Sequence, residues 1–190
     1  MNGLWLLLLS LGFAPSDLAA ESRPSSAQEI SITVFKGRHE LWLYRGTERL
    51  KIYRIFWGSS PGANKEKRGD NRTPIGNCRV VEKTENGKFH RFLAINYPNL
   101  QDADRAYDQG TITADDWVKI LQAEGTGAKP PWNTPLGGLL GIHGIGENEK
   151  LKLGLIEDMD WTNGCIALTN REVDELYRIV PLGAPVRIYE

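Results

Sequence analysis

Short runs of β-branched and aromatic residues, separated by tight turns, dominate this chain. Residues 30–35, 40–44 and 51–57 form three such runs, and turns containing Lys-Gly-Arg and Arg-Gly-Thr-Glu separate them. This spacing predicts an antiparallel meander. Residues 79–83 and 91–97 are two further runs, joined through Glu-Asn-Gly-Lys, which favours a hairpin. We therefore predict a mainly β domain, a sandwich or a barrel-like sheet, that ends in a strand over residues 186–189.

Helical patterns occur twice. Thr113 is placed to cap a helix that carries Trp117, Ile120 and Leu121 on one face. Thr169 and Glu172 have the spacing of a capping box, and apolar residues at helical spacing follow them. With strands outnumbering helices, the sequence predicts two or three helices at the periphery of the β domain.

The first twenty residues have the pattern of a secretory signal peptide. An apolar run covers residues 4–14, and Leu18-Ala19-Ala20 offers small residues for cleavage before Glu21. Residues 21–28 are polar and predict a short linker, which leaves residues 29–190 as one domain. We expect a protein of the periplasm or cell envelope without stable membrane insertion, and retention of the leader as an uncleaved anchor is the alternative.

Two residues stand out as a candidate nucleophile and base. The 190-residue chain has two cysteines and three histidines, and both Cys165 and His143 stand next to glycines. A cysteine thiol needs a neighbouring imidazole or positive charge to ionise at neutral pH. The turn Thr-Asn-Gly before Cys165 would expose N–H groups of Asn163, Gly164 and Cys165 to a developing oxyanion. This pattern predicts acyl transfer, whereas a buried structural cysteine and a core histidine are the alternative.

The second cysteine, Cys78, lies in a strand-like run and is predicted to fill core volume. One disulfide would be compatible with an oxidising compartment. Because that bond would consume the Cys165 nucleophile, we expect two free thiols.

The sequence resembles the YkuD-type L,D-transpeptidases. The resemblance rests on Gly-Ile-His-Gly around His143, Thr-Asn-Gly-Cys-Ile around Cys165, the capped helix after it, a closing Gly-x-Pro-Val-x-Ile, and Thr-Pro-Ile-Gly upstream. It implies a thioester between Cys165 and a peptidoglycan tetrapeptide, with His143 as the base and the Gly144 carbonyl orienting it. It also implies Gly164 in the oxyanion hole, transfer to a stem-peptide amine, a lipoprotein lysine or water, and no metal or cofactor.

Further residues are candidates for binding the stem peptide. Arg72, Arg91 and His90 could pair with its carboxylates, although a solvated surface role is the alternative for each. Thr162 matches a Ser or Thr of the family motif, and Trp161 could line the cleft. Asn163 replaces the His, Tyr or Arg that the family often has, and the segment between His143 and Cys165 is longer than usual. These departures leave the acceptor open and would suit a hydrolase of the same family.

Three other functions are alternatives to acyl transfer. A zinc hydrolase would need ligand spacings such as HExxH or CxxC, which the chain lacks. In a papain-like peptidase the cysteine precedes the histidine, whereas here His143 comes first. A wall-binding module without catalysis would not need both residues. The net charge of −1 argues against a nucleic-acid partner.

Overall fold

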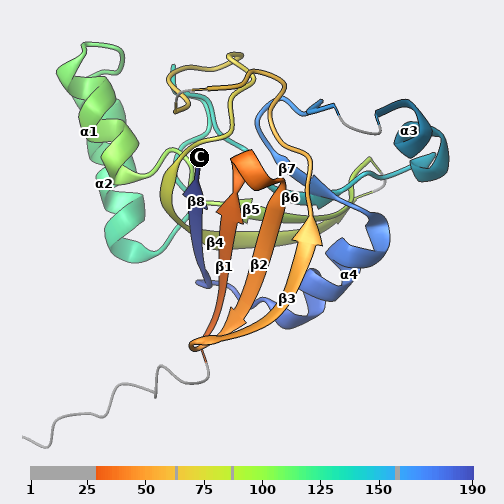
Figure 1. The fold of residues 1–190 in the computed structure, drawn as a ribbon. Coiled ribbons are helices and arrows are strands. Elements are labelled where there is room, and N and C mark those ends of the chain that lie inside the picture. The colour runs from red at the N-terminus through yellow and green to blue at the C-terminus, as the bar shows by residue number, and fades with distance from the viewer. Residues whose placement is uncertain (1–28, 63, 87, 157–158) are drawn as a thin grey trace, which may run out of the picture.

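One curled β-sheet organises the fold (Figure 1). The computed structural model describes residues 29–190 except residues 63, 87 and 157–158. Its eight strands pair in the order β3-β2-β1-β8-β4-β5-β6-β7. They are β1 (Ile30–Phe35), β2 (Glu40–Arg45), β3 (Glu48–Arg54), β4 (Gly76–Asn86), β5 (His90–Ile95), β6 (Gly141–Gly144), β7 (Ile166–Leu168) and β8 (Pro185–Tyr189).

The two ends of the strand order approach each other. After β3 the chain leaves the sheet, and Phe56 forms an isolated antiparallel bridge with Ala167 of β7. Gly58 then bridges Thr162 in parallel. These two bridges make the sheet nearly a barrel, which confirms the predicted mainly β, barrel-like fold.

The predicted strands are present, with shifted ends. β1, β2 and β3 pair as an antiparallel meander, and β4 and β5 form the predicted hairpin. The third strand was predicted over residues 51–57, but it begins at Glu48 and stops at Arg54 because Phe56 turns away to meet Ala167. β8 inserts between β1 and β4, parallel to the first and antiparallel to the second.

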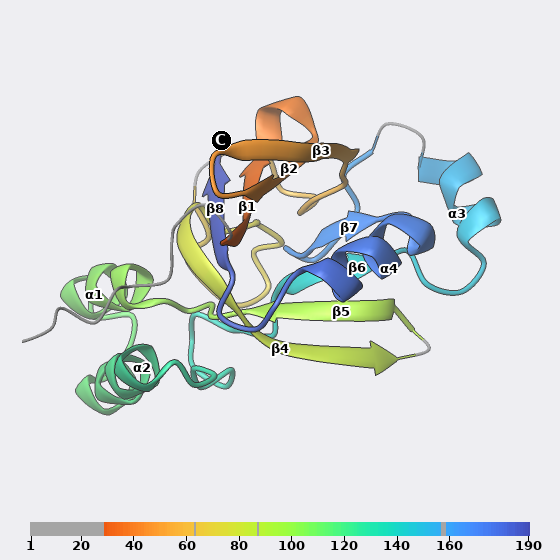
Figure 2. The ribbon, with the colours of Figure 1, turned by 90° about the horizontal axis from the view of Figure 1, so that it is seen from below.

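In the described part of the chain, four α-helices accompany the sheet: α1 (Leu100–Asp108), α2 (Ala114–Thr126), α3 (Glu149–Ile156) and α4 (Asn170–Ile179). The capping boxes predicted at the starts of α2 and α4 are both formed, at Thr113 and Thr169. In α2, Ile120 is buried as predicted, but Leu121 is exposed. Figure 2 shows α1 and α2 side by side and projecting from the sheet, while α4 packs against β5 and β6.

Two helices were not predicted. The buried residues of α1 include Asp102, Ala103 and Ala106, which give no large apolar stripe. Gly144, Gly146 and the charged residues after them predict a loop, but this prediction is wrong because α3 forms there. Leucines 151 and 155 are one helical turn apart, but both are exposed, so they give no buried apolar stripe.

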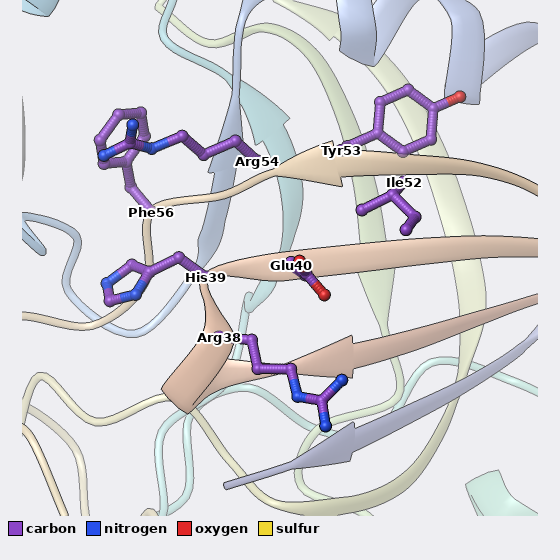
Figure 3. Close-up of a pocket in the computed structure, with 7 residues that line it drawn as sticks. All are labelled: Arg38, His39, Glu40, Ile52, Tyr53, Arg54 and Phe56. Atoms are coloured by element: carbon purple, nitrogen blue, oxygen red, sulfur yellow. The ribbon is translucent and has the colours of Figure 1, made fainter.

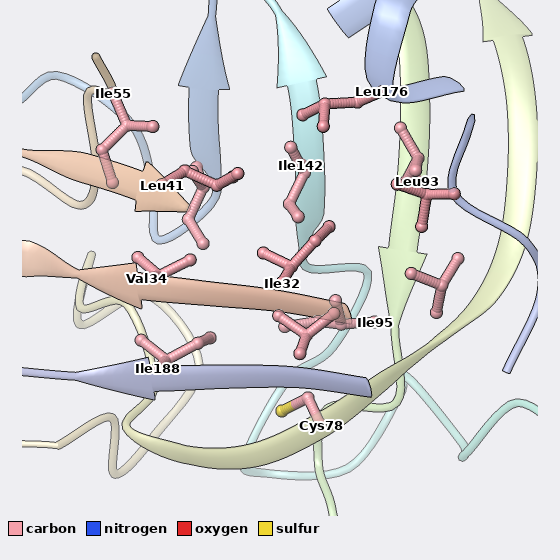
Figure 4. Close-up of a cluster of buried hydrophobic side chains, with 14 of the residues drawn as sticks. Ile32, Val34, Leu41, Ile55, Cys78, Leu93, Ile95, Ile142, Leu176 and Ile188 are labelled. Atoms are coloured by element: carbon pink, nitrogen blue, oxygen red, sulfur yellow. The ribbon is translucent and has the colours of Figure 1, made fainter. Parts of the chain in front are cut away.

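The core lies inside the curled sheet and under α4 (Figure 4). Aliphatic side chains from both halves of the sheet meet there, and Leu176 of α4 closes it. Cys78 points into this core, and burial raises the pKa of its thiol to about 12. Both cysteines are free thiols, and Cys78 has the structural place that the sequence predicted.

The predicted signal peptide, residues 1–20, and linker, residues 21–28, lie outside the described residues. Within the part of the chain that the structure describes, no helix combines the length and the apolarity needed to cross a membrane.

Candidate active site

Two neighbouring parallel strands bring His143 and Cys165 together. In β6 and β7, Ile142 pairs with Ile166 and His143 pairs with Ala167. Extending this register by one residue places Cys165 opposite Gly141, on the face that also carries His143, because side chains alternate along a strand. Strand spacing and rise then put the Cα atoms of His143 and Cys165 about 8 Å apart, which two side chains can span.

The strand that carries His143 begins later than the sequence pattern indicates. The apolar run at residues 139–142 predicts a strand with His143 at its end, but β6 covers Gly141–Gly144, so His143 lies inside it. Leu139 has a φ of +54°, outside the range of a strand. Its carbonyl oxygen lies 3.9 Å from Cys165 Sγ, so this non-strand residue is the thiol's acceptor.

The imidazole of His143 is held in one tautomer. Its Nδ1 lies 2.7 Å from the Gly144 carbonyl oxygen, which can only accept, so Nδ1 carries the proton. Nε2 is therefore the nitrogen with a free lone pair. The rings of Phe89, Phe92 and Trp161 surround the imidazole at centroid distances of 4.4, 6.0 and 6.2 Å. Burial lowers the pKa of His143 to about 4, so the ring is neutral at pH 7.

The turn before Cys165 is held by Thr162. The Thr162 hydroxyl donates to the Cys165 carbonyl at 2.6 Å and accepts from the Gly164 N–H at 3.1 Å. Thr162 is also buried, and its hydroxyl is used within the turn. A role for Thr162 in binding substrate stays a prediction. The Gly164 N–H can serve an oxyanion only by sharing or leaving that bond. Asn163, beside it, is exposed.

The thiol of Cys165 is un-ionised at rest. Burial raises its pKa to about 11, while the Gly141 backbone N–H and the Lys65 ammonium act in the opposite direction. Among the hydrogen bonds of the described residues, none joins Sγ to His143. The site therefore holds a neutral thiol and a neutral imidazole on one face. Apo sites often have such loose geometry, which tightens when substrate is bound.

Gly164 fits closely against the segment before β4. A Cβ at Gly164 would lie 2.6 Å from the Arg72 carbonyl oxygen, and the φ of Gly164 is +116°. Only glycine suits both constraints. The Arg72 guanidinium itself contacts Glu66 at 3.5 Å. Arg72 therefore meets the turn of residues 162–165, called the nucleophile turn, through its backbone carbonyl.

Two residues predicted to bind substrate have protein partners in the structure. His90 Nε2 lies 3.0 Å from one Asp174 oxygen, and Arg91 Nε donates to the other at 2.9 Å. Asp174 belongs to α4, so these contacts tie β5 to that helix. Pairing of His90 and Arg91 with substrate carboxylates stays a prediction. Trp161 does border the site, through its contact with His143.

A cavity of about 480 Å³ lies away from the pair, on β2 and β3. Figure 3 shows that His39, Arg54 and Phe56 gather at one end of it, while the Tyr53 ring points elsewhere. Neither His143 nor Cys165 lines this cavity. Across the described residues, no three His, Cys, Asp or Glu side chains are grouped so that they could hold a metal ion.

One buried ion pair, in the segment packed on Gly164, was not anticipated from the sequence. Lys65 is only 3% exposed, and its ammonium lies 2.5 Å from Asp70. Burial would raise the pKa of Asp70, but hydrogen bonds from Lys65 and from backbone N–H groups lower it to about 2. In the sequence, the pairing of Lys65 with Asp70 was indicated only by their spacing of five residues, and such spacing of opposite charges is common in solvated loops.

Comparison with known proteins identifies the family. The model of the YkuD L,D-transpeptidase catalytic domain matches residues 29–188. The chain belongs to this family. A search of curated proteins found no match.

Solved structures share the fold at low identity. Bd1075 of Bdellovibrio bacteriovorus is 17% identical with a TM-score of 0.55, and the match covers 86% of this chain and 49% of that one. The helical cell shape determining protein Pgp2 of Campylobacter jejuni is 18% identical with a TM-score of 0.56, covering 85% and 48%. This chain thus spans about half the length of either structure.

Proposed function

We propose that this L,D-transpeptidase family member is a cysteine acyltransferase that acts on peptidoglycan tetrapeptide stems. Nε2 of His143 takes the thiol proton of Cys165 as the sulfur attacks the carbonyl before the terminal D-alanine. The carbon–nitrogen bond then breaks, His143 returns the proton to the leaving amine, and D-alanine departs. The product is a thioester on Cys165.

The second half-reaction reverses these roles. An acceptor amine attacks the thioester carbonyl, His143 takes its proton, and the thiol of Cys165 is restored. A neighbouring stem peptide or a lipoprotein lysine would supply that amine. Water in the same place would make the protein a carboxypeptidase.

The observation that supports this mechanism best is the hydrogen bond from His143 Nδ1 to the Gly144 carbonyl. It leaves Nε2 as a base on the same face as Cys165. The low pKa of His143, about 4, keeps that base neutral at the pH of the reaction. A histidine with only a packing role in the core would not need a fixed tautomer beside a cysteine-bearing turn.

The test is intact-mass analysis of the protein incubated with a disaccharide tetrapeptide. We expect a mass gain equal to the donor minus D-alanine, lost in Cys165→Ala and kept in the matched control Cys78→Ala. An adduct on Cys165→Ala would contradict the assignment. Adding an amine acceptor then separates the two outcomes, since a cross-linked product indicates transfer and a tripeptide alone indicates hydrolysis.

We further propose that the protein works in the cell envelope after loss of residues 1–20. The apolar run 4–14 and the small residues before Glu21 support this. Protein isolated from the envelope and alkylated without reductant should begin near Glu21 and carry two alkylated cysteines. Full-length protein in the cytoplasm would contradict the proposed location.

A further inference from the structure

An ammonium group is buried in the segment that packs on the turn before Cys165. Lys65 lies in the segment between β3 and β4, and its residue exposure is 3%. Lysine is almost never buried to this degree unless it is paired. Its Nζ donates to Asp70 Oδ1 at 2.5 Å and to the Lys67 carbonyl at 3.0 Å. An ammonium has three N–H groups, and these two bonds use two of them.

The segment that holds Lys65 is packed directly on the nucleophile turn. The Ser59 N–H donates to the Thr162 carbonyl at 2.9 Å. The Arg72 carbonyl lies against Gly164, with no room for a Cβ between them. Asp70 Oδ1, which binds Lys65, also accepts from the Arg72 N–H at 3.1 Å. Lys65, Asp70 and the cysteine turn thus form one connected unit.

Few charged groups act on the ionisation of the Cys165 thiol. Burial raises the pKa of the Cys165 thiol, and the Gly141 backbone N–H and the Lys65 ammonium act in the opposite direction. Among the described residues, Lys65 is the one side-chain charge that acts on this pKa. His143, on the adjacent strand, is neutral because burial lowers its pKa to about 4. The guanidinium of Arg72 is turned to Glu66. Asp70 carries the opposite charge to Lys65 and offsets part of its field.

We propose that Lys65 is a positioning residue whose buried ammonium stabilises the thiolate form of Cys165, and that Asp70 limits this effect. The proposal rests on the proposed function only in treating Cys165 as the nucleophile. In the acylation step, the thiol proton still passes to His143. The ammonium favours the anionic sulfur that forms as the proton leaves, and it takes part in no bond change.

Substitution of Lys65 and substitution of Asp70 should change the rate of Cys165 alkylation in opposite directions. This difference separates an electrostatic role of the pair from a structural one. The measurement is the rate of Cys165 alkylation by iodoacetamide below the titration midpoint, from pH 7 upward, followed by peptide mass spectrometry. The ratio of the rates of two variants at one pH gives the difference between their midpoints. Lys65→Met should slow alkylation about tenfold below the titration midpoint, equivalent to a midpoint about one pH unit higher. Asp70→Asn should speed alkylation and lower the midpoint, because the Lys65 charge is then no longer offset.

A purely structural pair would behave differently. Either substitution would loosen the same segment, so both would move the alkylation midpoint in the same direction, and that result would overturn the proposal. Lys129→Met is the matched control, since it removes an ammonium from an exposed pair with Glu82. It should leave the midpoint unchanged.

Folding of the variants is checked within the same experiment. Cys78 is buried in the core, so its protection from iodoacetamide reports the native state. If a single variant leaves one charge buried and fails to fold, the double variant Lys65→Met/Asp70→Asn removes both charges and decides the matter. Slower alkylation than in the unmodified protein supports the proposal, and an unchanged rate overturns it. Because iodoacetamide needs no stem peptide, this result is independent of whether the transferase activity is found.

Discussion

Replacing Thr162 with valine isolates the hydrogen bonds that shape the nucleophile turn. Valine keeps the size of the buried side chain but cannot donate to the Cys165 carbonyl or accept from the Gly164 N–H, contacts of 2.6 and 3.1 Å. Each lost hydrogen bond costs about 0.5–1.5 kcal/mol, and a buried partner left unsatisfied adds more. We therefore expect Thr162→Val to lower the free energy of unfolding by about 2–4 kcal/mol.

Urea unfolding measures this change directly. With a slope of about 2 kcal/mol/M, the midpoint should fall by about 1–2 M with the slope unchanged. Covalent labelling of Cys165 by a carbapenem should slow in parallel, because the sulfur and its carbonyl are no longer fixed. Thr162→Ser keeps the hydroxyl and should retain most of both properties.

The matched control is Thr126→Val. Thr126 is exposed on α2 and donates to the Gln122 carbonyl at 2.8 Å, so the same chemical change is made where water can replace the bond. It should change the free energy of unfolding by less than about 0.5 kcal/mol. Equal losses for Thr162→Val and Thr126→Val would refute the argument that burial of the turn gives Thr162 its importance.

Further outcomes follow from the same site. Cys165→Ala and His143→Ala should each abolish nearly all turnover, with the double variant little worse; additive partial losses would make His143 structural. A carbapenem should label Cys165 and spare Cys78 in peptide mapping, and labelling of Cys78 would contradict the site. Gly164→Ala should destabilise the fold and slow acylation, because its Cβ would lie 2.6 Å from a carbonyl oxygen. The pKa of Asp70 is lowered to about 2 from an ordinary 3.8, so its ionised carboxylate stabilises the fold above about pH 4, and this stabilisation is lost as the pH falls toward 2. Unfolding curves from pH 6 to 2 should show the loss. In Asp70→Asn this part of the pH dependence should be absent.

The features predictable from sequence were those encoded locally. The capping boxes at Thr113 and Thr169 need only residues three positions apart, and both formed. The strand runs and the turns between them are also local patterns, and they predicted the mainly β fold. α1 was missed because the residues it buries are small or charged. The buried Asp102 carboxylate is bound by Arg105 at 2.6 Å and by Asn64 at 3.3 Å.

In the candidate site too, local motifs were predictable from the sequence and long-range contacts were not. His143 and Cys165 could be singled out because each stands in a short motif with its glycines. The pairing of His90 and Arg91 with Asp174 spans more than 80 residues of sequence, so no local pattern could predict it. Burial of Lys65 likewise depends on how its segment packs against the nucleophile turn, which no local pattern records.

The parallel pairing of β6 and β7 has a consequence for how such a protein can change over time. Parallel neighbours require a crossover between them, and here α3 lies in it. The separation of His143 and Cys165 is set by the strand pairing and not by the length of that crossover. Insertions in the crossover can therefore leave the two side chains in place. Leucines 151 and 155 of α3 are exposed, so changes at these two positions disturb no buried contact.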